Sequence, residues 1–311
     1  MRRPWLILPL ALGSLALAGC EFDPTEWSDS DRFKEDFAYN HKLTPGGRVM
    51  LESFNGSVEV LGWDKDSVDI TGAKYASREE VMRDIKIDIV AEADSIRIRA
   101  IRPIERNCNC GARFVLKVPK KSLLDNIQSS NGSVRVESVT GNARLKTSNG
   151  SIRVWGVTGT LDASTSNASI DVGQFQGAAT LHTSNGRIKA DGVNGAFEAH
   201  TSNASIDAQI ASLESGRTLE AHSSNGSINL TLDKWANNEI KATTSNSSVN
   251  LRLPEGLHAD LRASTSNGNI TTDFEVATSQ FSKTRLNGRL NGGGALIDLS
   301  TSNGNIRLMK R

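Results

Sequence analysis

From residue 126 onward, the chain repeats one short pattern of apolar and polar residues. In the repeat that begins at Asn149, apolar residues alternate with polar ones, first at Ile152 and Val154 and later at Leu161 and Ala163. Alternation with a period of two predicts β-strands that bury one face. The neighbouring repeats carry apolar residues at the same offsets, so the pattern predicts a series of equivalent strands.

A Ser-Asn-Gly triplet, or a close variant of it, marks each repeat. The asparagines of these triplets are Asn131, Asn149, Asn167, Asn185, Asn203, Asn225, Asn246, Asn267 and Asn303. The first five follow one another at intervals of 18 residues, and the next three at intervals of 22, 21 and 21. Such a period is typical of a β-solenoid. Because these asparagines share the inward parity of Thr165, we expect an internal ladder of amide hydrogen bonds between coils.

Two architectures fit the pattern, a meander of hairpins and a parallel β-helix. Asn-Gly between apolar runs favours hairpins, but a type I′ turn needs a positive φ after the Asn, and Ala168, Ala204 and Ser247 stand there in three repeats. Large and small residues also exchange places between repeats. The pairs are Ala143/Leu145, Leu161/Ala163, Ala179/Leu181 and Phe197/Ala199. Because stacked strands lie about 4.8 Å apart, this exchange favours coils that interlock, as a close-packed interior requires.

The sequence therefore predicts an all-β fold, a single-stranded parallel β-solenoid (β-helix) of about 18–22 residues per coil over residues 126–311. A glycine marks a bend in several coils, at Gly141, Gly159, Gly177 and Gly195. We expect residues 45–125 to form an irregular β region that caps one end of the solenoid. Within this region, the Ser77–Glu80 segment predicts a capping box for a short helix over Ser77–Arg83. At the other end, we expect Ile306–Leu308 to form an uncapped last strand, which permits end-to-end self-association.

Residues 1–20 read as an export signal. Arg2 and Arg3 precede an apolar stretch that is too short to span a bilayer, and the segment ends in Leu17-Ala18-Gly19-Cys20. This ending resembles the lipobox of bacterial lipoproteins, which implies that Cys20 becomes a lipidated N-terminus that holds the protein on a membrane. Residues 21–44, acidic and rich in aromatics, are expected to begin as a tether and to end as a strand or a cap.

A family resemblance rests on short motifs spread over residues 45–310. These motifs are Phe54-Asn-Gly-Ser-Val-Glu-Val60, then Gly62-Trp63-Asp64, a strand that ends in Val118-Pro119, and Ser130-Asn-Gly-Ser-Val134 with Gly141. Together they resemble the bacterial putative-adhesin domain, a family of exported β-solenoids. The resemblance implies a location in the cell envelope, at the outer membrane or the cell surface. It brings no catalytic residue to this chain.

Two groups of residues are candidates for chemistry. Cys108 and Cys110 are the only thiols besides Cys20, and in an oxidising compartment we expect a local disulfide between them, with a redox or metal-binding role as the alternative. The second group shares one outward column and the positions two residues before it. It comprises His182, His200, His222, Glu198 and Glu220. Imidazoles and carboxylates on adjacent coils predict a transition-metal site, and a solvated surface on which histidine recurs is the alternative.

The remaining features argue against an enzyme. The chain has no nucleophile elbow, phosphate loop or dinucleotide fingerprint, so we expect neither catalysis nor a cofactor. A net charge of +1 implies no nucleic-acid partner. We expect a lipid-anchored envelope protein whose repetitive polar surface binds an unknown ligand, either a protein or a glycan. A self-associating scaffold and a β-helical carbohydrate-active enzyme are the alternatives.

Overall fold

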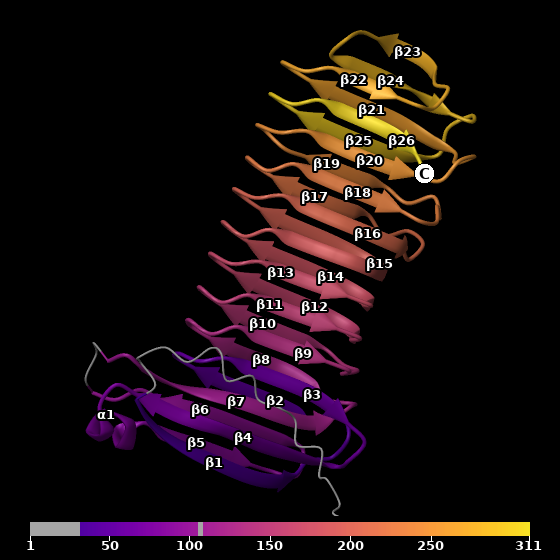
Figure 1. The fold of residues 1–311 in the computed structure, drawn as a ribbon. Coiled ribbons are helices and arrows are strands. Elements are labelled where there is room, and N and C mark those ends of the chain that lie inside the picture. Colours follow the sequence, from indigo (N-terminus) through magenta and orange to yellow (C-terminus); the bar gives the residue numbers. More distant parts are fainter. Residues whose placement is uncertain (1–31, 105–107) are drawn as a thin grey trace, which may run out of the picture.

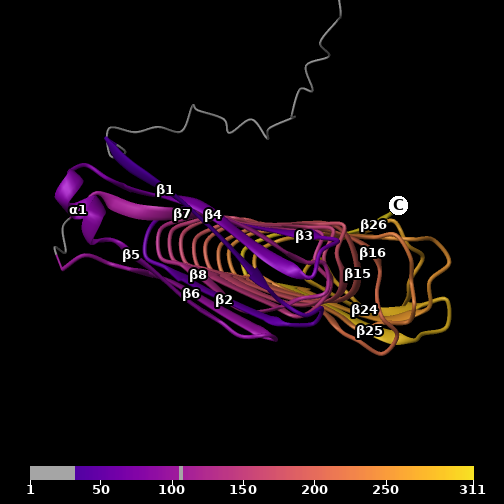
Figure 2. The same cartoon turned by 90° about the horizontal axis from the view of Figure 1, so that it is seen from below.

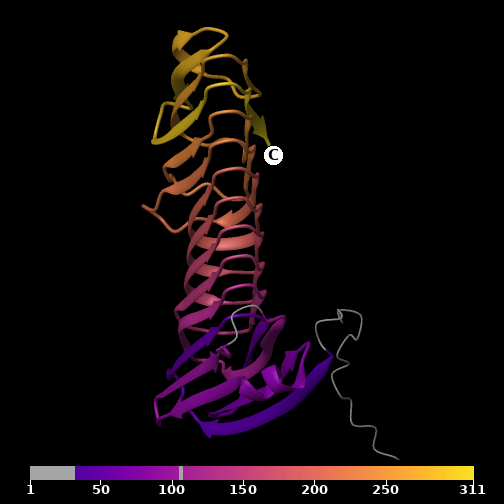
Figure 3. The same cartoon turned by 90° about the vertical axis from the view of Figure 1, so that its left-hand side faces the viewer.

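The computed structural model describes residues 32–104 and 108–311. Over these residues the protein consists of 26 strands and one short helix, α1 (Glu79–Asp84). The strands form an elongated stack of coils that stands on a wider group of strands at the N-terminal end (Figures 1 and 3). No helix in this part of the chain has the length and hydrophobicity needed to cross a membrane.

Each coil contributes one strand to each of two faces, which lie back to back across a narrow core (Figure 2). Face A contains, in order of pairing, β5 (Lys86–Ala91), β6 (Ser95–Ile101), β2 (Arg48–Ser53), β8 (Leu123–Ser129), β10 (Ala143–Thr147), β12 (Thr158–Thr165), β14 (Gln176–Thr183), the second half of β15 (Ile188–Thr201), β17 (Leu219–Ser223), β19 (Ile240–Thr243), β25 (Ala295–Thr301), β21 (Ala259–Thr265), β24 (Arg285–Leu290) and β23 (Ala277–Phe281).

Face B continues from the other half of each coil. It contains β1 (Phe33–Lys42), β4 (Ser67–Ala76), β7 (Cys110–Pro119), β3 (Val58–Trp63), β9 (Val134–Glu137), β11 (Ile152–Trp155), β13 (Ile170–Gly173), the first half of β15, β16 (Ile206–Ser212), β18 (Ile228–Leu232), β20 (Val249–Leu253), β26 (Ile306–Lys310) and β22 (Ile270–Thr272). The coils pair in parallel, and the β-solenoid prediction is confirmed.

The core is the apolar space between the two faces, and adjacent coils interlock there as the sequence predicts. Leu161 lies beside Ala143 and Ala179, while Ala163 lies beside Leu145 and Leu181. All of these side chains are buried. The exchange ends after the fourth pair. From that pair onward the large residues Phe197, Leu219 and Ile240 stack in register on face A, while face B carries Ala190 and Ala208 and then Leu230.

The predicted glycine bends bring the backbones of adjacent coils very close together. Gly159 has a φ of +134°, and a Cβ atom placed on it would lie 2.2 Å from the carbonyl oxygen of Gly141 in the preceding coil. Gly177 repeats this relation with Gly159 at 1.9 Å. Any side chain at these positions would meet a backbone atom that cannot move without disturbing the stack, so only glycine fits.

The asparagine ladder connects coils, but it lies at the surface. Asn167 donates a hydrogen bond from Nδ2 to Oδ1 of Asn149 at 2.7 Å, and the other asparagines of the set make the same bond to a neighbouring coil. The ladder begins at Asn55, which accepts from Asn131. Each of the nine donors is exposed, so the expectation of an internal ladder is wrong. The inward parity ends with the strand at Thr165, and Asn167 already belongs to the turn.

A column of buried hydroxyl groups forms the internal connection instead. Thr183 donates from Oγ1 to the carbonyl oxygen of Ala168 at 3.1 Å and accepts from the backbone N–H of Gly186 at 3.1 Å. One hydroxyl therefore binds the turn of its own coil and the turn of the preceding coil. The same column contains Ser129, Thr147, Thr165, Thr201, Ser223, Thr244, Thr265 and Thr301.

The last two strands of the sequence lie inside the stack. β25 pairs with β19 on one side and β21 on the other, and β26 pairs with β20 and β22. The coil of β21 and β22 thus lies farther out than the C-terminal coil, and the hairpin of β23 and β24 extends it (Figure 1). The expectation that Ile306–Leu308 forms an uncapped end is wrong, because β26 has neighbours on both sides.

At the N-terminal end, β1, β4 and β7 pair antiparallel on face B, and β5 pairs antiparallel with β6 on face A. Helix α1 begins one residue after Arg78, which is its N-cap residue and makes no side-chain capping bond. The predicted helix is present, but the capping box at Ser77 is not. Val81 and Met82 bury the helix against a small apolar cluster that includes Ile85 and Cys110.

Candidate functional site

An exposed tryptophan stands on face B, on the strand β11. This strand alternates strictly, so Ile152 and Val154 point into the core while Arg153 and Trp155 point out. The side chain of Trp155 is 49% exposed. Leaving so large an apolar surface in water forgoes a substantial burial energy, and exposed aromatics of this kind commonly mark binding surfaces.

The next coil is shaped to receive the Trp155 ring. Trp155 lies beside Gly173 on β13. A Cβ atom on Gly173 would come within 2.0 Å and 2.2 Å of two carbons of the six-membered ring of the indole. The ring therefore occupies the space directly over the Gly173 backbone. Gly173 has no positive φ, so the space it leaves for Trp155, not backbone conformation, explains why a side chain does not fit here.

A groove of about 610 Å³ surrounds this tryptophan and crosses β9, β11, β13 and β15; we call it the Trp155 groove. Its charged lining residues are Arg135, Glu137, Arg153, Asp171, Lys189 and Asp191. Three are cationic and three are anionic, so the formal charges of the groove cancel. Lysine, arginine and aspartate can donate to or accept from a polar ligand, and the indole offers an apolar surface between them.

At one end of the groove the charges are already satisfied within the protein. Arg135 donates from Nε to Oε1 of Glu137 at 2.7 Å and lies 3.5 Å from Oε1 of Glu59. The hydrogen bond to Glu137 raises the pKa of the Arg135 guanidinium above its ordinary value, so this residue stays charged at any physiological pH. By contrast, Arg153, Lys189 and Asp191 have no side-chain ion pair or hydrogen bond with any of residues 32–104 and 108–311. These three side chains are available to a ligand.

The histidine column lies on face A, with the register that the sequence predicts. His200 lies beside His182 and His222, and Glu198 lies beside Glu220. The rings of His182 and His200 stack with centroids 5.2 Å apart, and Oε1 of Glu198 accepts a hydrogen bond from Nε2 of His200 at 2.9 Å. Glu220 instead accepts from Lys241 at 2.9 Å.

These five residues share a surface but do not converge. Within the described residues, no group of three or more histidine, cysteine, aspartate or glutamate side chains is arranged to hold a metal ion. The carboxylate that would complete a set of ligands, Glu220, is paired with a lysine. The column therefore lacks the convergence that a transition-metal site needs.

The cysteines divide between described and undescribed parts of the chain. Cys108 and Cys110 form a disulfide, with Cα atoms 5.2 Å apart, at the start of β7. The carbonyl oxygen of Cys110 accepts a hydrogen bond from Nδ2 of Asn55, the first residue of the asparagine ladder. The pair thus belongs to the N-terminal end of the solenoid and lies far from Trp155 in the stack. Cys20 lies outside the described residues.

Sequence reasoning did not single out the Trp155 groove. The signal was present, because Trp155 occupies an outward position in Ile152-Arg-Val-Trp155, where a polar residue is expected. The groove itself depends on side chains from four coils, whose alignment became clear only with the pairing register.

The family assignment follows from the match of a family model to most of the chain. The model described as Toastrack DUF4097 matches residues 65–309. The chain belongs to the Toastrack family. The resemblance found in the sequence is thereby confirmed, and the fold of the Toastrack chain agrees with it.

Solved structures similar to this Toastrack chain include two bacterial proteins. One is a "putative cell adhesion protein" from Clostridium sporogenes ATCC 15579, with 8% identity and a TM-score of 0.23 over 89% of this chain and 100% of that chain. Another is a "putative adhesin" from Bacteroides fragilis NCTC 9343, with 9% identity and a TM-score of 0.35 over 88% of this chain and 97% of that chain. Comparison with curated proteins finds no match. Function must therefore be argued from the site itself.

Proposed function

We propose that this protein is a lipid-anchored adhesion protein of the bacterial cell envelope, which binds a surface ligand through the Trp155 groove. The observation that carries the proposal is the exposed indole of Trp155, seated over Gly173, in a groove where Arg153, Lys189 and Asp191 have no side-chain partner among the described residues. The export signal and the lipobox at Cys20 support the location.

The architecture supports this function mechanically. A β-solenoid is a rigid rod, because each coil is bonded to the next along both faces and through the buried hydroxyl column. A rod whose N-terminal end is tethered to a membrane would hold its coils away from the lipid surface. Rows of polar side chains, repeated from coil to coil, would then add many weak contacts to the central one, which strengthens binding by avidity.

The proposal is tested by the attachment of cells that display the full-length chain. Such cells are passed over glass coated with bacterial cell-envelope fragments, and the retained cells are counted. Trp155→Ala should reduce retention toward the level of cells without the protein. The matched control is Phe281→Ala, since Phe281 is an aromatic residue that is 69% exposed but lies on β23 at the far end of the solenoid.

Two results would count against the proposal. Equal retention of wild-type and Trp155→Ala cells, at equal surface display measured with an antibody, would exclude the groove as the adhesive site. Loss of retention in the Phe281→Ala control would show that general surface changes, and not the groove, govern attachment.

A further inference from the structure

We infer that the Trp155 groove binds an uncharged polysaccharide chain; this inference rests on the proposed function and names the class of its ligand. The first argument is the shape of the apolar surface. One side of the Trp155 indole covers Gly173, and the ring remains half exposed to solvent. A pyranose ring has an apolar side made of C–H groups, which packs against an aromatic surface of this size.

The second argument is the polar rim of the same groove. A sugar ring carries hydroxyl groups around its edge, each of which both donates and accepts hydrogen bonds. Arg153 on β11 and Lys189 on β15 supply donors, and Asp191 supplies an acceptor next to them. Asp171 lies between Arg153 and Lys189 in the register. Charged partners make the stronger hydrogen bonds to neutral hydroxyl groups.

The third argument is the charge balance, which selects against acidic ligands. From Arg153 toward the C-terminal coils, cationic and anionic side chains alternate along one column of face B, as Arg153, Asp171, Lys189 and Asp207, while on its other side Arg153 lies beside Arg135, which is paired with Glu137. An acidic polysaccharide or a phosphate would meet a carboxylate next to each cation. A neutral chain can use both kinds of side chain as hydrogen-bonding partners without such repulsion.

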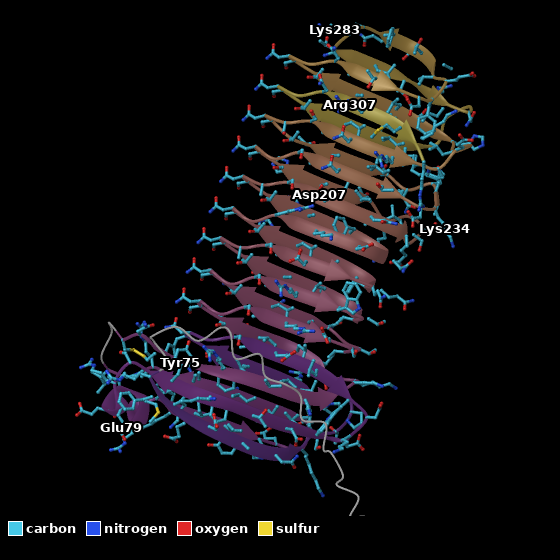
Figure 4. All side chains as sticks on the ribbon, viewed as in Figure 1. Tyr75, Glu79, Asp207, Lys234, Lys283 and Arg307 are labelled. Carbon is cyan, nitrogen blue, oxygen red and sulfur yellow. A yellow bond between two sulfur atoms is a disulfide. The ribbon has the colours of Figure 1, made fainter. Side chains whose placement is uncertain are left out.

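The fourth argument is the length of the surface. The same column continues beyond Asp207 through Asn229, Asn250 and Arg307. At a strand spacing of about 4.8 Å, the six steps from Arg153 to Arg307 extend for about 29 Å. A second hollow, lined by Asn229, Asn250 and Arg307 among others, lies at the far end. Figure 4 shows Asp207 and Arg307 on the face of the solenoid turned to the viewer. This surface suits a chain of several sugars better than a single one.

A peptide ligand fits the same surface less well. Peptides commonly add a strand to a free sheet edge, but β11 and β13 are each paired on both sides. Other peptide sites hold side chains in deep apolar pockets. Here the apolar residues Val154 and Val172 on the groove floor are buried in the core, and the exposed apolar area is chiefly that of Trp155.

The test is calorimetric titration of the soluble chain, beginning at residue 21, with neutral hexasaccharides. The probes are β-linked glucose and β-linked N-acetylglucosamine oligomers, with glucose, polygalacturonate and a mixed peptide library as comparisons. We expect a neutral hexasaccharide to bind, and Trp155→Ala to weaken it by about tenfold or more, as for other buried aromatic anchors. Trp155→Phe should retain part of the affinity. Gly173→Ala, which displaces the indole, should weaken binding with Trp155 still present, and Phe281→Ala should leave the affinity unchanged.

Salt separates hydrogen bonding from ion pairing. The affinity for the neutral hexasaccharide should change little between low and high salt, because no net charge is neutralised on binding. The inference is overturned if no neutral hexasaccharide binds, if Trp155→Ala binds as the wild type does, or if only polygalacturonate or peptides bind. Cell attachment that depends on Trp155, without binding of any neutral glycan, would overturn the glycan assignment alone. If, in addition, cell attachment does not depend on Trp155, the proposed function is overturned as well.

Discussion

The buried hydroxyl column predicts that each hydroxyl oxygen contributes measurably to the joining of two coils, and Thr183 offers the sharpest test. Thr183→Val keeps the shape of the side chain and removes its hydroxyl group. The carbonyl oxygen of Ala168 and the N–H of Gly186 both lose their partner. Because Thr183 is buried, water cannot replace the lost bonds without opening the turn.

The magnitude follows from these two groups. Each buried backbone group left without a partner costs about 1–3 kcal/mol, and the added methyl group recovers about 1 kcal/mol by burial. The free energy of unfolding should therefore fall by about 1–5 kcal/mol. Thr183→Ser, which restores the hydroxyl group, should recover most of this loss, as the natural Ser223 does at the equivalent position.

The same strand supplies a matched control. Thr180 also lies on β14, but it points outward and is exposed. Thr180→Val should change the free energy of unfolding by less than about 0.5 kcal/mol, as expected for a surface position. The assay is urea denaturation of the chain beginning at residue 21, followed by far-ultraviolet circular dichroism. Equal stability of Thr183→Val and the wild type, or an equal loss in Thr180→Val, would show that the buried hydroxyl group does not hold the coils together.

Three further predictions concern the core, the bend and the anchor. Leu161→Ala should lower the free energy of unfolding by about 2–5 kcal/mol. Adding Ala163→Leu should not restore the stability, because the new leucine would stack on Leu145 and Leu181. Restored stability of the double variant in the same urea assay would show that the interlock is unimportant. Gly159→Ala should lower the melting temperature measured by calorimetry, because its Cβ would lie 2.2 Å from the Gly141 oxygen, and an unchanged melting temperature would contradict the close packing of coils. Cys20→Ser should move the protein from the membrane fraction to the soluble fraction, and a variant that still sediments with membranes would refute the lipid anchor.

Much of the fold could be predicted because its determinants repeat along the sequence. The 18-residue spacing of Asn131 to Asn203 fixed the coil length, and the exchange of Leu161 and Ala163 indicated which coils are neighbours. Side chains alternate between inward and outward only inside a strand. Extending this alternation into the turn therefore placed the asparagine ladder wrongly in the interior. The position of the C-terminal coil depends on pairing between β19 and β25, which are distant in sequence. Its only sequence signal was the longer interval between Asn267 and Asn303.

The candidate site was harder to predict for a related reason. The histidines occupy the same outward position in successive coils, so the column is visible in the repeat. Alignment alone, however, does not bring ligands together around a metal. The Trp155 groove needs the glycine of the next coil, together with Arg153 on β11 and Lys189 and Asp191 on β15, whose side chains have no ion-pair partner among the described residues. Whether Arg153 or Lys189 finds an ion-pair partner depends on side-chain geometry, which the repeat pattern does not contain.

Hydroxyl-radical footprinting tests the central claim, that ligands bind at the Trp155 groove, without assuming what the ligand is. The soluble chain is oxidised alone and in the presence of bacterial cell-envelope fragments, and the modification of each aromatic residue is measured by mass spectrometry. Trp155 and Phe281 are both well exposed and should both react in the free protein. Envelope fragments should protect Trp155 and leave Phe281 reactive. Full reactivity of Trp155 in the bound protein, with protection elsewhere on the solenoid, would contradict the central claim.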